Sequence, residues 1–227
     1  MATREYYDKE LVQIEEHVAE MAQKVLETID KTIFAVNNLS TDISNEILAN
    51  DDRIDELETK IEEDCINIVV QQAPIASDWR KLASIMRLIG DLERIADNCS
   101  DICQHVKSLS VEKKLSLSRN LNDEFISMRH MMADTFKSYI EGDVALARTV
   151  SDADDKVDNL NEMVEKELVA IMQKDAESIV PAIEYLSIAK YVERMADHAA
   201  SISAWIAFIV EGKLSIKYTD RYRNDTE

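Results

Sequence analysis

Turn-forming residues are scarce in this chain. Only three glycines and two prolines occur among its 227 residues. A β-rich protein of this length would need many more, because tight turns depend on glycine, proline and a few small polar residues. The shortage excludes a sheet-rich fold and favours long helices with few connections. Hydrophobic residues make up 46 % of the sequence, so a substantial core can form.

Positive charge is also in short supply. The chain has 26 lysines and arginines against 45 aspartates and glutamates, which gives a formal net charge of −19. Nucleic acids and anionic membranes are bound by neutralising phosphates with basic side chains, so the composition disfavours both as partners. Metal cations or a basic patch on another protein suit the charge better. A solvated acidic surface that maintains solubility would also account for the charge alone.

Cysteines and long apolar runs are equally sparse. The three cysteines are odd in number and fit no paired disulfide framework. The longest apolar run, Ala199–Val210, is too short to span a bilayer, which needs about 20 residues. The first ten residues have no apolar core and do not read as a signal peptide. We therefore expect a soluble protein in the reducing environment of the cytoplasm.

The hydrophobic residues that are present follow a helical period. From Leu11 to Val36 they recur at steps of three and four, which predicts a first helix over about residues 8–37. A second helix should run to about Gln72, and a third over 78–109. Further stripes predict three more helices, and one set of apolar positions recurs 103 residues later: Ile47, Ile54, Ile61 and Ile68 against Val150, Val157, Val164 and Ile171.

A repeat of about 100 residues indicates duplication of a three-helix unit. We predict an all-α fold with six helices, arranged as two antiparallel three-helix bundles related by a pseudo-twofold axis. The first repeat should cover residues 1–113 and the second residues 114–212, with a polar tail over 213–227. An extended coiled coil is the alternative, but regular breaks between the stripes favour compact bundles.

Clustered acidic residues also occur twice. "DDRIDEL" begins at Asp51 and "DDKVDNL" at Asp154, while "ERIAD" begins at Glu93 and "ERMAD" at Glu193. Acidic residues four positions apart lie on one face of a helix. Residues equidistant from the turn of a helical hairpin lie at the same height, because antiparallel helices have equal rise. The acidic elements of each half should therefore be level with one another, Asp55 with Asp97 being one such pair.

Converging carboxylates repel one another and resist ionising together. A cation between them relieves the repulsion, and oxygen-rich sites suit Ca, Mg, Mn or Fe. The alternatives are a solvated acidic surface, or ion pairs with Arg53, Arg94, Lys156 and Arg194. The two halves also differ. Lys190 stands where the first half has Gly90. A lysine beside the acidic residues of the second half can take the place of a bound cation, which would weaken the second site. His198 could add a nitrogen ligand there.

No catalytic constellation stands out in the sequence. It has no glycine-rich phosphate loop and no histidine at the spacing of a zinc-protease helix. "ERIAD" and "ERMAD" also lack the histidine that ferritin-like diiron enzymes carry three residues after the glutamate. We therefore expect a protein that is not an enzyme. A plain metal-binding helical scaffold and a carboxylate-bridged metalloenzyme remain the alternative hypotheses.

The two acidic elements that close the repeats, "DLERIADN" and "YVERMADH", resemble the PhoU family of phosphate-signalling regulators. "APIASDWRKLASIMRLIGDLERIAD" is similar to that family's signature, and the resemblance covers roughly residues 8–210. It implies two three-helix repeats, each with a multinuclear iron or zinc cluster on its acidic face. The family's pattern falls on Asp51/Asp55, Glu93/Asp97, Asp154/Asp158 and Glu193/Asp197, with Asp52 and Asp155 close enough to join. This chain departs from the pattern at Lys190, and at Tyr191 and Ser201, the counterparts of Asp91 and Asp101.

The resemblance also implies a function. PhoU-like proteins are cytoplasmic adaptors that contact the ATPase subunit of a phosphate transporter and a membrane sensor histidine kinase. They restrain phosphate uptake and starvation signalling when phosphate is plentiful. We therefore expect a metal-binding negative regulator of phosphate transport, with a homodimer as a further expectation.

Overall fold

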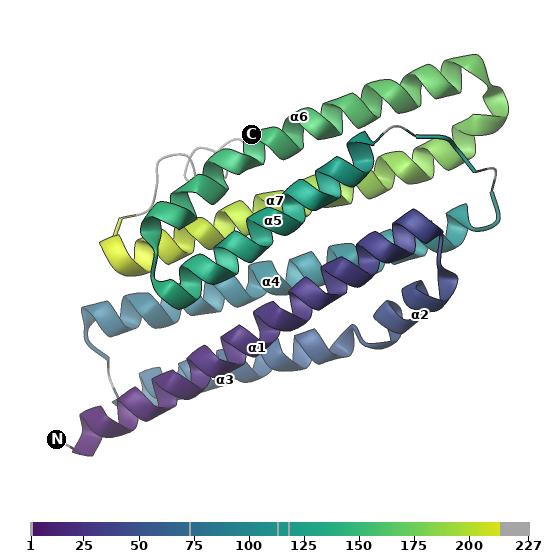
Figure 1. Cartoon of the computed structure of the whole chain (residues 1–227). Helices are drawn as coiled ribbons and strands as arrows, with labels where there is room; N and C mark the ends of the chain where they lie inside the picture. Colours follow the sequence, from purple (N-terminus) through teal and green to yellow (C-terminus); the bar gives the residue numbers. More distant parts are fainter. Residues whose placement is uncertain (1, 73, 113, 118, 214–227) are drawn as a thin grey trace, which may run out of the picture.

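The chain folds into helices throughout the part that the structure describes. The computed structural model describes residues 2–72, 74–112, 114–117 and 119–213, and no β-strand occurs among them. The described residues form seven α-helices, labelled in Figure 1, and a short 3-10 turn, η1. In chain order they are α1 (Ala2–Asn38), α2 (Thr41–Ala49), α3 (Asp52–Gln72), α4 (Ala76–Leu109), α5 (Asn120–Glu141), α6 (Val144–Lys174), η1 (Ala176–Ser178) and α7 (Ile179–Glu211).

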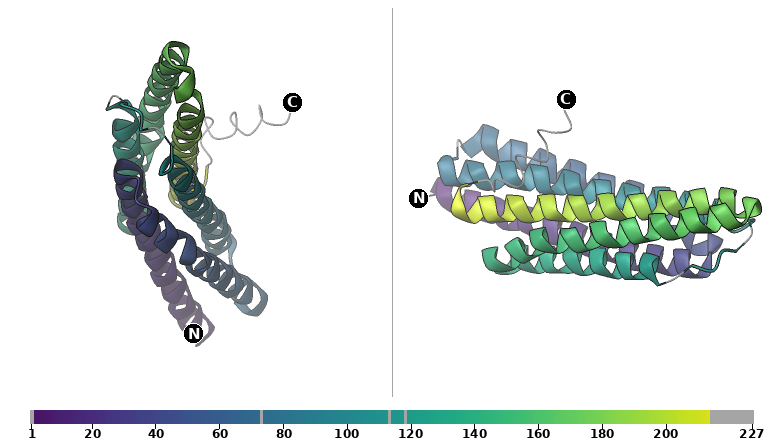
Figure 2. Two further views of the ribbon diagram at one scale, coloured as in Figure 1. Left: turned by 90° about the vertical axis from the view of Figure 1, so that its right-hand side faces the viewer. Right: turned by 90° about the horizontal axis from the view of Figure 1, so that it is seen from above.

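These helices form two antiparallel bundles side by side. The first contains α1 to α4 and the second α5 to α7, and the two pack together mainly through α4 and α7, with α1 against α5 (Figure 1). The right-hand view of Figure 2 shows that the helices follow a common long direction. The predicted all-α fold of two repeated bundles is confirmed. The predicted boundary after residue 113 falls in the connection between α4 and α5.

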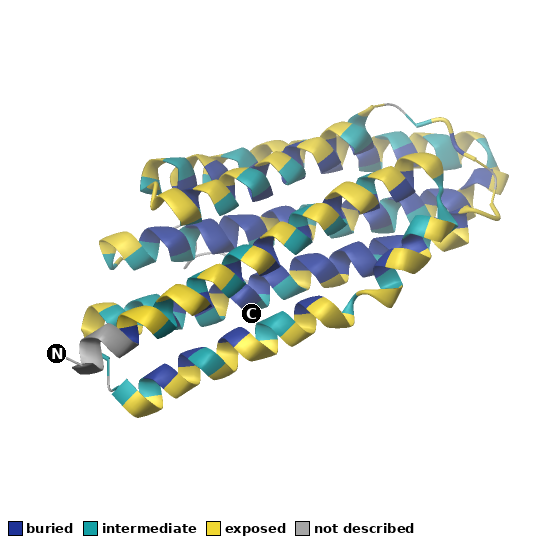
Figure 3. Cartoon of the chain, turned by 60° about the horizontal axis from the view of Figure 1, so that its bottom comes forward, coloured by how far each residue is buried: buried dark blue, intermediate teal, exposed yellow. Residues whose placement is uncertain are grey.

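The apolar stripes identified in the sequence form the core. Residues such as Ile29, Ile61 and Ile95 in the first repeat, and Val157 and Ile188 in the second, are fully buried. Figure 3 shows buried residues on the inner faces of the helices and exposed ones on the outside. Burying one such side chain contributes about 1.5–3 kcal/mol, so packing against other helices is the main source of helix stability.

The second predicted helix is divided in the structure. Asn50 ends α2, where its backbone N–H donates to Ile47 at 3.0 Å and its side chain donates to Glu46 at 2.7 Å. Asn competes in this way for backbone groups and is a poor interior helix residue. The corresponding position in the second repeat is Ala153, the best helix former, and α6 runs through it unbroken. The asparagine at position 50 therefore explains why the structure has seven α-helices where six were predicted.

The connection between α5 and α6 uses the signals expected of it. Gly142 takes a left-handed conformation with φ of 63°, which costs glycine little and other residues more. Asp143 follows as the N-cap of α6 and accepts a hydrogen bond from the Leu146 backbone at 3.0 Å. The third predicted helix, expected from residue 78, begins slightly earlier in the structure, where α4 starts at Ala76.

Matched polar pairs cross the interface between α4 and α7. Ser201 donates to Asp91 at 2.6 Å, and Tyr191 hydrogen-bonds Asp101. Position 191 corresponds to 91 and position 201 to 101, so the two pairs are related by the pseudo-twofold axis. The departures from the repeat noted in the sequence are thus paired with one another across the interface. His198 adds a contact of 2.9 Å from Nδ1 to Asp91.

The C-terminal tail and the membrane-spanning potential of the helices complete the description of the fold. The predicted polar tail, apart from Lys213, lies outside the described residues. None of the helices in the described ranges combines the length and apolar character needed to cross a membrane.

Candidate metal centre

Three carboxylates converge between α3 and α4. Asp55 comes from the first turns of α3, and Glu93 and Asp97 lie one helical turn apart on α4. Each offers an oxygen within 4.8 Å of the others, and they form the one group of this kind in the described part of the chain. The hairpin levels the two helices as the spacing predicted. Oxygen ligands at this separation suit a hard or borderline cation.

The charges of these groups interact strongly. Burial, followed by repulsion from Asp97 and other nearby carboxylates, raises the pKa of Glu93 to about 7. The pKa values of Asp97 and Asp55 are raised as well, in each case first by burial and then by Asp51. Raised pKa values mean that the free carboxylates resist ionising together. A bound cation would remove this penalty.

Two other predicted ligands lie beside this group. Asp51 sits in the break between α2 and α3, where Ser100 Oγ donates to its Oδ1 at 2.8 Å. Asp52 opens α3 and contributes to the raised pKa of Asp55. The structure therefore gathers all five predicted ligands of the first repeat at one end of the α3–α4 contact.

The second repeat does not reproduce this arrangement. Its corresponding carboxylates, Asp158, Glu193 and Asp197, form no such close group within the described residues. Asp154 is 1 % exposed, and Ala200 stands where the first repeat has the serine that binds Asp51. Asp155 points to solvent. All five predicted ligands are thus present on α6 and α7, but their carboxylates are not drawn together.

Lys190 contacts the acidic flank of the second repeat. Its Nζ lies 3.0 Å from Glu193 Oε2, 3.1 Å from Glu165 Oε1 and 3.1 Å from Asn161 Oδ1. Burial lowers the pKa of Lys190, but its hydrogen bonds with Glu193 and Glu165 outweigh that effect and raise it. The ammonium therefore stays charged.

Sequence reasoning missed the buried member of this network, Glu124 on α5. It is 0 % exposed, and its Oε1 accepts a hydrogen bond from Asn161 Nδ2 at 3.0 Å. Its Oε2 accepts none within the described residues. Burial raises the pKa of Glu124 to about 8. A signal was available, because Glu124 lies three residues after Leu121 and therefore inside an apolar stripe, 103 positions after Met21.

The remaining candidates have structural positions. His198 contacts Asp91 across the bundle interface, as described above, so its Nδ1 is already engaged. Cys99 and Cys103 are buried thiols, and burial raises the pKa of Cys99 to about 12. A protonated buried thiol packs as a small apolar group and is a poor metal ligand.

The chain is similar to known proteins over almost its whole length. The model of the PhoU domain matches the chain twice, over residues 18–106 and 127–206. The phosphate-specific transport system accessory protein PhoU homolog of Aquifex aeolicus is 34 % identical over 91 % of this chain and 93 % of its own. Homolog 1 of Thermotoga maritima is 30 % identical over 94 % of this chain and 92 % of its own.

Solved structures show the same fold. PhoU from Pseudomonas aeruginosa superposes with a TM-score of 0.87, at 25 % identity, over 91 % of this chain and all of that one. The phosphate transport system regulatory protein PhoU from Streptococcus pneumoniae gives a TM-score of 0.85, at 27 % identity, over 92 % of this chain and 99 % of that one. Both matches extend over the two repeats.

Proposed function

Because the chain belongs to the PhoU family, we propose that it is an accessory protein of a phosphate-specific transport system and restrains phosphate uptake when phosphate is plentiful. The observation that carries the proposal is the double match to the PhoU domain, one in each repeat. Relatives that cover almost the whole chain are named as accessory proteins of that system. The protein would act as a cytoplasmic adaptor without catalytic activity.

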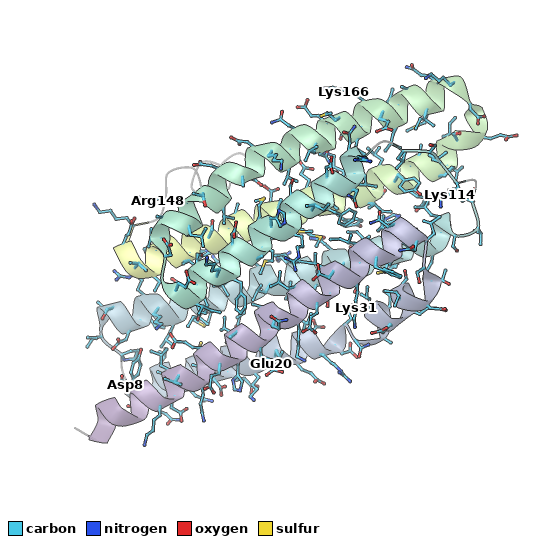
Figure 4. The ribbon with its side chains drawn as sticks, in the orientation of Figure 1. Asp8, Glu20, Lys31, Lys114, Arg148 and Lys166 are labelled. Atoms are coloured by element: carbon cyan, nitrogen blue, oxygen red, sulfur yellow. The ribbon has the colours of Figure 1, made fainter. Side chains whose placement is uncertain are left out.

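Two partners follow from this role: the ATPase subunit of the transporter and a sensor histidine kinase. The net charge of −19 supports docking on basic patches, since complementary charge accelerates encounter and fixes orientation. The exposed face of α1 carries carboxylates such as those of Asp8 and Glu20 (Figure 4). Binding of this kind should weaken as salt is added, because ions screen exposed charges.

The test combines genetics with binding. Deleting the gene in its own host should leave phosphate-starvation genes switched on in rich phosphate, and the intact gene should restore repression. The purified chain should bind the ATPase subunit or the kinase, with an affinity that falls between low and high salt. Unchanged expression in the deletion strain, together with no binding to either partner at low salt, would refute the adaptor role.

A metal site in the first repeat is part of the same proposal. Asp55, Glu93 and Asp97 would hold it, with Asp51 and Asp52 completing a multinuclear iron or zinc site, or one of Mg, Mn or Ca. The residues fit such a group, because three carboxylate oxygens lie within 4.8 Å and their pKa values are raised. The metal would supply positive charge that ties α3 to α4.

This part has its own measurement. Glu93→Ala with Asp97→Ala should remove the metal of the first repeat, as measured by elemental analysis of protein purified without chelators or a histidine tag. The matched control is Glu16→Ala with Glu20→Ala, which removes two glutamates at the same spacing from the exposed face of α1. Equal metal content in both double variants would place the metal elsewhere.

A further inference from the structure

Four matched positions lie around the acidic residues of the two repeats, and the repeats carry different residues at two of them. On α3 the first repeat has Glu58 and Glu62, and the corresponding residues of α6, 103 positions later, are Asn161 and Glu165. On α4 and α7, which are offset by 100 positions, Gly90 corresponds to Lys190 and Glu93 to Glu193. The first repeat therefore presents three carboxylates and no cation at these positions, and the second presents two carboxylates and an ammonium.

From this difference we infer that the Lys190 ammonium is the resident cation of the second repeat and takes there the place of a metal ion. The inference rests on the proposed metal site of the first repeat for its comparison, but it concerns different residues. The second repeat would hold its acidic helices together without metal, and this chain would bind metal in one repeat alone.

The contacts of Lys190 support this role. A lysine ammonium has three N–H donors, and the structure places three oxygen acceptors around Nζ at 3.0–3.1 Å. Two acceptors come from α6 and one from α7, so the side chain joins the same pair of helices that a metal would join. Glu193 is the matched residue of Glu93 and is engaged by this ammonium, one helical turn before Asp197.

The neighbours of Lys190 are adjusted to a single positive charge. Asn161 offers a neutral oxygen to the ammonium and donates its Nδ2 to the buried carboxyl group of Glu124. A glutamate at position 161, as in the first repeat, would place a second carboxylate against Glu124 in a site closed to water. In the first repeat the position of Glu124 is taken by the buried Met21, and no acid is buried among the residues of α1 whose burial the structure describes. Lys190, Asn161 and Glu124 therefore belong together: they replace Gly90, Glu58 and Met21 of the first repeat as a group.

The first repeat has room for the opposite exchange. A Cβ atom added at Gly90 would lie 3.6 Å from Glu58 Oε1, which is an ordinary contact distance. A side chain at that position would therefore meet the acidic flank without a backbone clash. Grafting the lysine and asparagine into the first repeat should transfer the built-in cation with them.

The experiment measures Mn²⁺ binding to metal-free full-length protein by electron paramagnetic resonance of the free ion. All second-repeat variants are made in the Glu93→Ala, Asp97→Ala background, which silences the first repeat. With Lys190 intact, this background should bind no Mn²⁺ in the second repeat. Adding Lys190→Ala with Asn161→Glu should create Mn²⁺ binding in the second repeat, at least about 10-fold tighter than any residual binding by the background protein, because the exchange removes a positive charge and adds a negative one beside the ligands.

The control makes the same two exchanges on exposed helix faces. Lys166→Ala with Asn67→Glu changes the net charge equally, and Lys166 lies on the outer side of α6 (Figure 4). It should leave Mn²⁺ binding unchanged. The reciprocal graft, Gly90→Lys with Glu58→Asn in the native chain, should abolish Mn²⁺ binding by the first repeat.

The outcomes separate this inference from the proposed first-repeat site. A native chain that binds no Mn²⁺, with binding gained on exchanging Lys190 and Asn161, would refute the first-repeat site and support the inference. Mn²⁺ binding by the second repeat with Lys190 intact, as tight as that of the first, would overturn it. The inference would also be overturned if the variant with Lys190→Ala and Asn161→Glu were folded and helical but gained no Mn²⁺ binding. If that variant does not fold, two measurements still test the inference: Mn²⁺ binding by the background protein with Lys190 intact, and Mn²⁺ binding by the reciprocal graft.

Discussion

The buried carboxyl group of Glu124 should make the stability of this protein depend on pH. Glu124 is 0 % exposed, and burial raises its pKa from 4.5 to about 8. In the unfolded chain the group ionises near its ordinary pKa, whereas in the folded protein it keeps its proton until about pH 8. The folded state therefore binds more protons between these values, and the free energy of unfolding should fall as pH rises through this range.

The size of the effect follows from the shift. Between about pH 5 and about pH 9 a group with these two pKa values would lower the free energy of unfolding by about 4 kcal/mol, if the whole shift were realised. Water penetration and relaxation around Asn161 and Lys190 reduce such penalties, so we expect about 2 kcal/mol. Glu124→Gln keeps the shape and the acceptor for Asn161 and removes the charge.

The assay is urea unfolding of the metal-free protein, followed by the circular dichroism of its helices at several pH values. The native chain and Glu124→Gln should be close in stability at about pH 5, where the glutamate of the folded protein is protonated. At about pH 9 the variant should be more stable by about 2 kcal/mol. Because both proteins share every other titrating group, their difference isolates Glu124. A difference that stays constant with pH would refute the reasoning and leave Glu124 with a purely structural role.

Two further predictions concern the interface and the connection between α5 and α6. Ser201→Ala removes the hydrogen bond to the nearly buried Asp91 and should lower the free energy of unfolding by about 1–3 kcal/mol. Ser187→Ala, which removes only a hydroxyl that donates to the Ile183 backbone within α7, should change it little, and equal losses in urea unfolding would contradict this. Gly142→Ala places a Cβ on a residue in the left-handed conformation, and no other atom lies within 4 Å of that Cβ. Backbone strain alone should therefore lower the free energy of unfolding by about 1–2 kcal/mol, which would be measured as a lower melting temperature. An unchanged or higher melting temperature would contradict this prediction.

The sequence was sufficient for most of the fold because its information is local and periodic. Apolar spacing set the helices, and the shift of 103 positions revealed the duplication. The division of the second helix could not be read from that spacing, since Ile47 and Ile54 keep the stripe in register across Asn50. The break depends instead on the side chain of one asparagine, which binds the backbone of the preceding turn.

The candidate site was predictable in the first repeat and less so in the second. A hairpin with equal helical rise fixes which carboxylates lie level, so Asp55 and Asp97 could be matched by counting. The burial of Glu124 was missed although the residue lies inside an apolar stripe, because charged residues are ordinarily assigned to the surface. Lys190 was visible as an exchange for Gly90, but its partners Asn161 and Glu165 come from another helix and required the packed structure.

The crossed pairs between α4 and α7 also bear on whether either repeat could exist as a self-paired copy. If two first repeats came together through the same face, Asp91 of one would meet Asp101 of the other, and two carboxylates would share a nearly buried position. Two second repeats would place Tyr191 against Ser201 and leave both without an acidic acceptor. Each hydroxyl has its acceptor only in the mixed pairing. After duplication the two repeats have thus become complementary to each other and no longer to themselves. A fragment that carries one repeat should therefore fail to pair with a second copy of itself in the way that the two repeats pair in the intact chain.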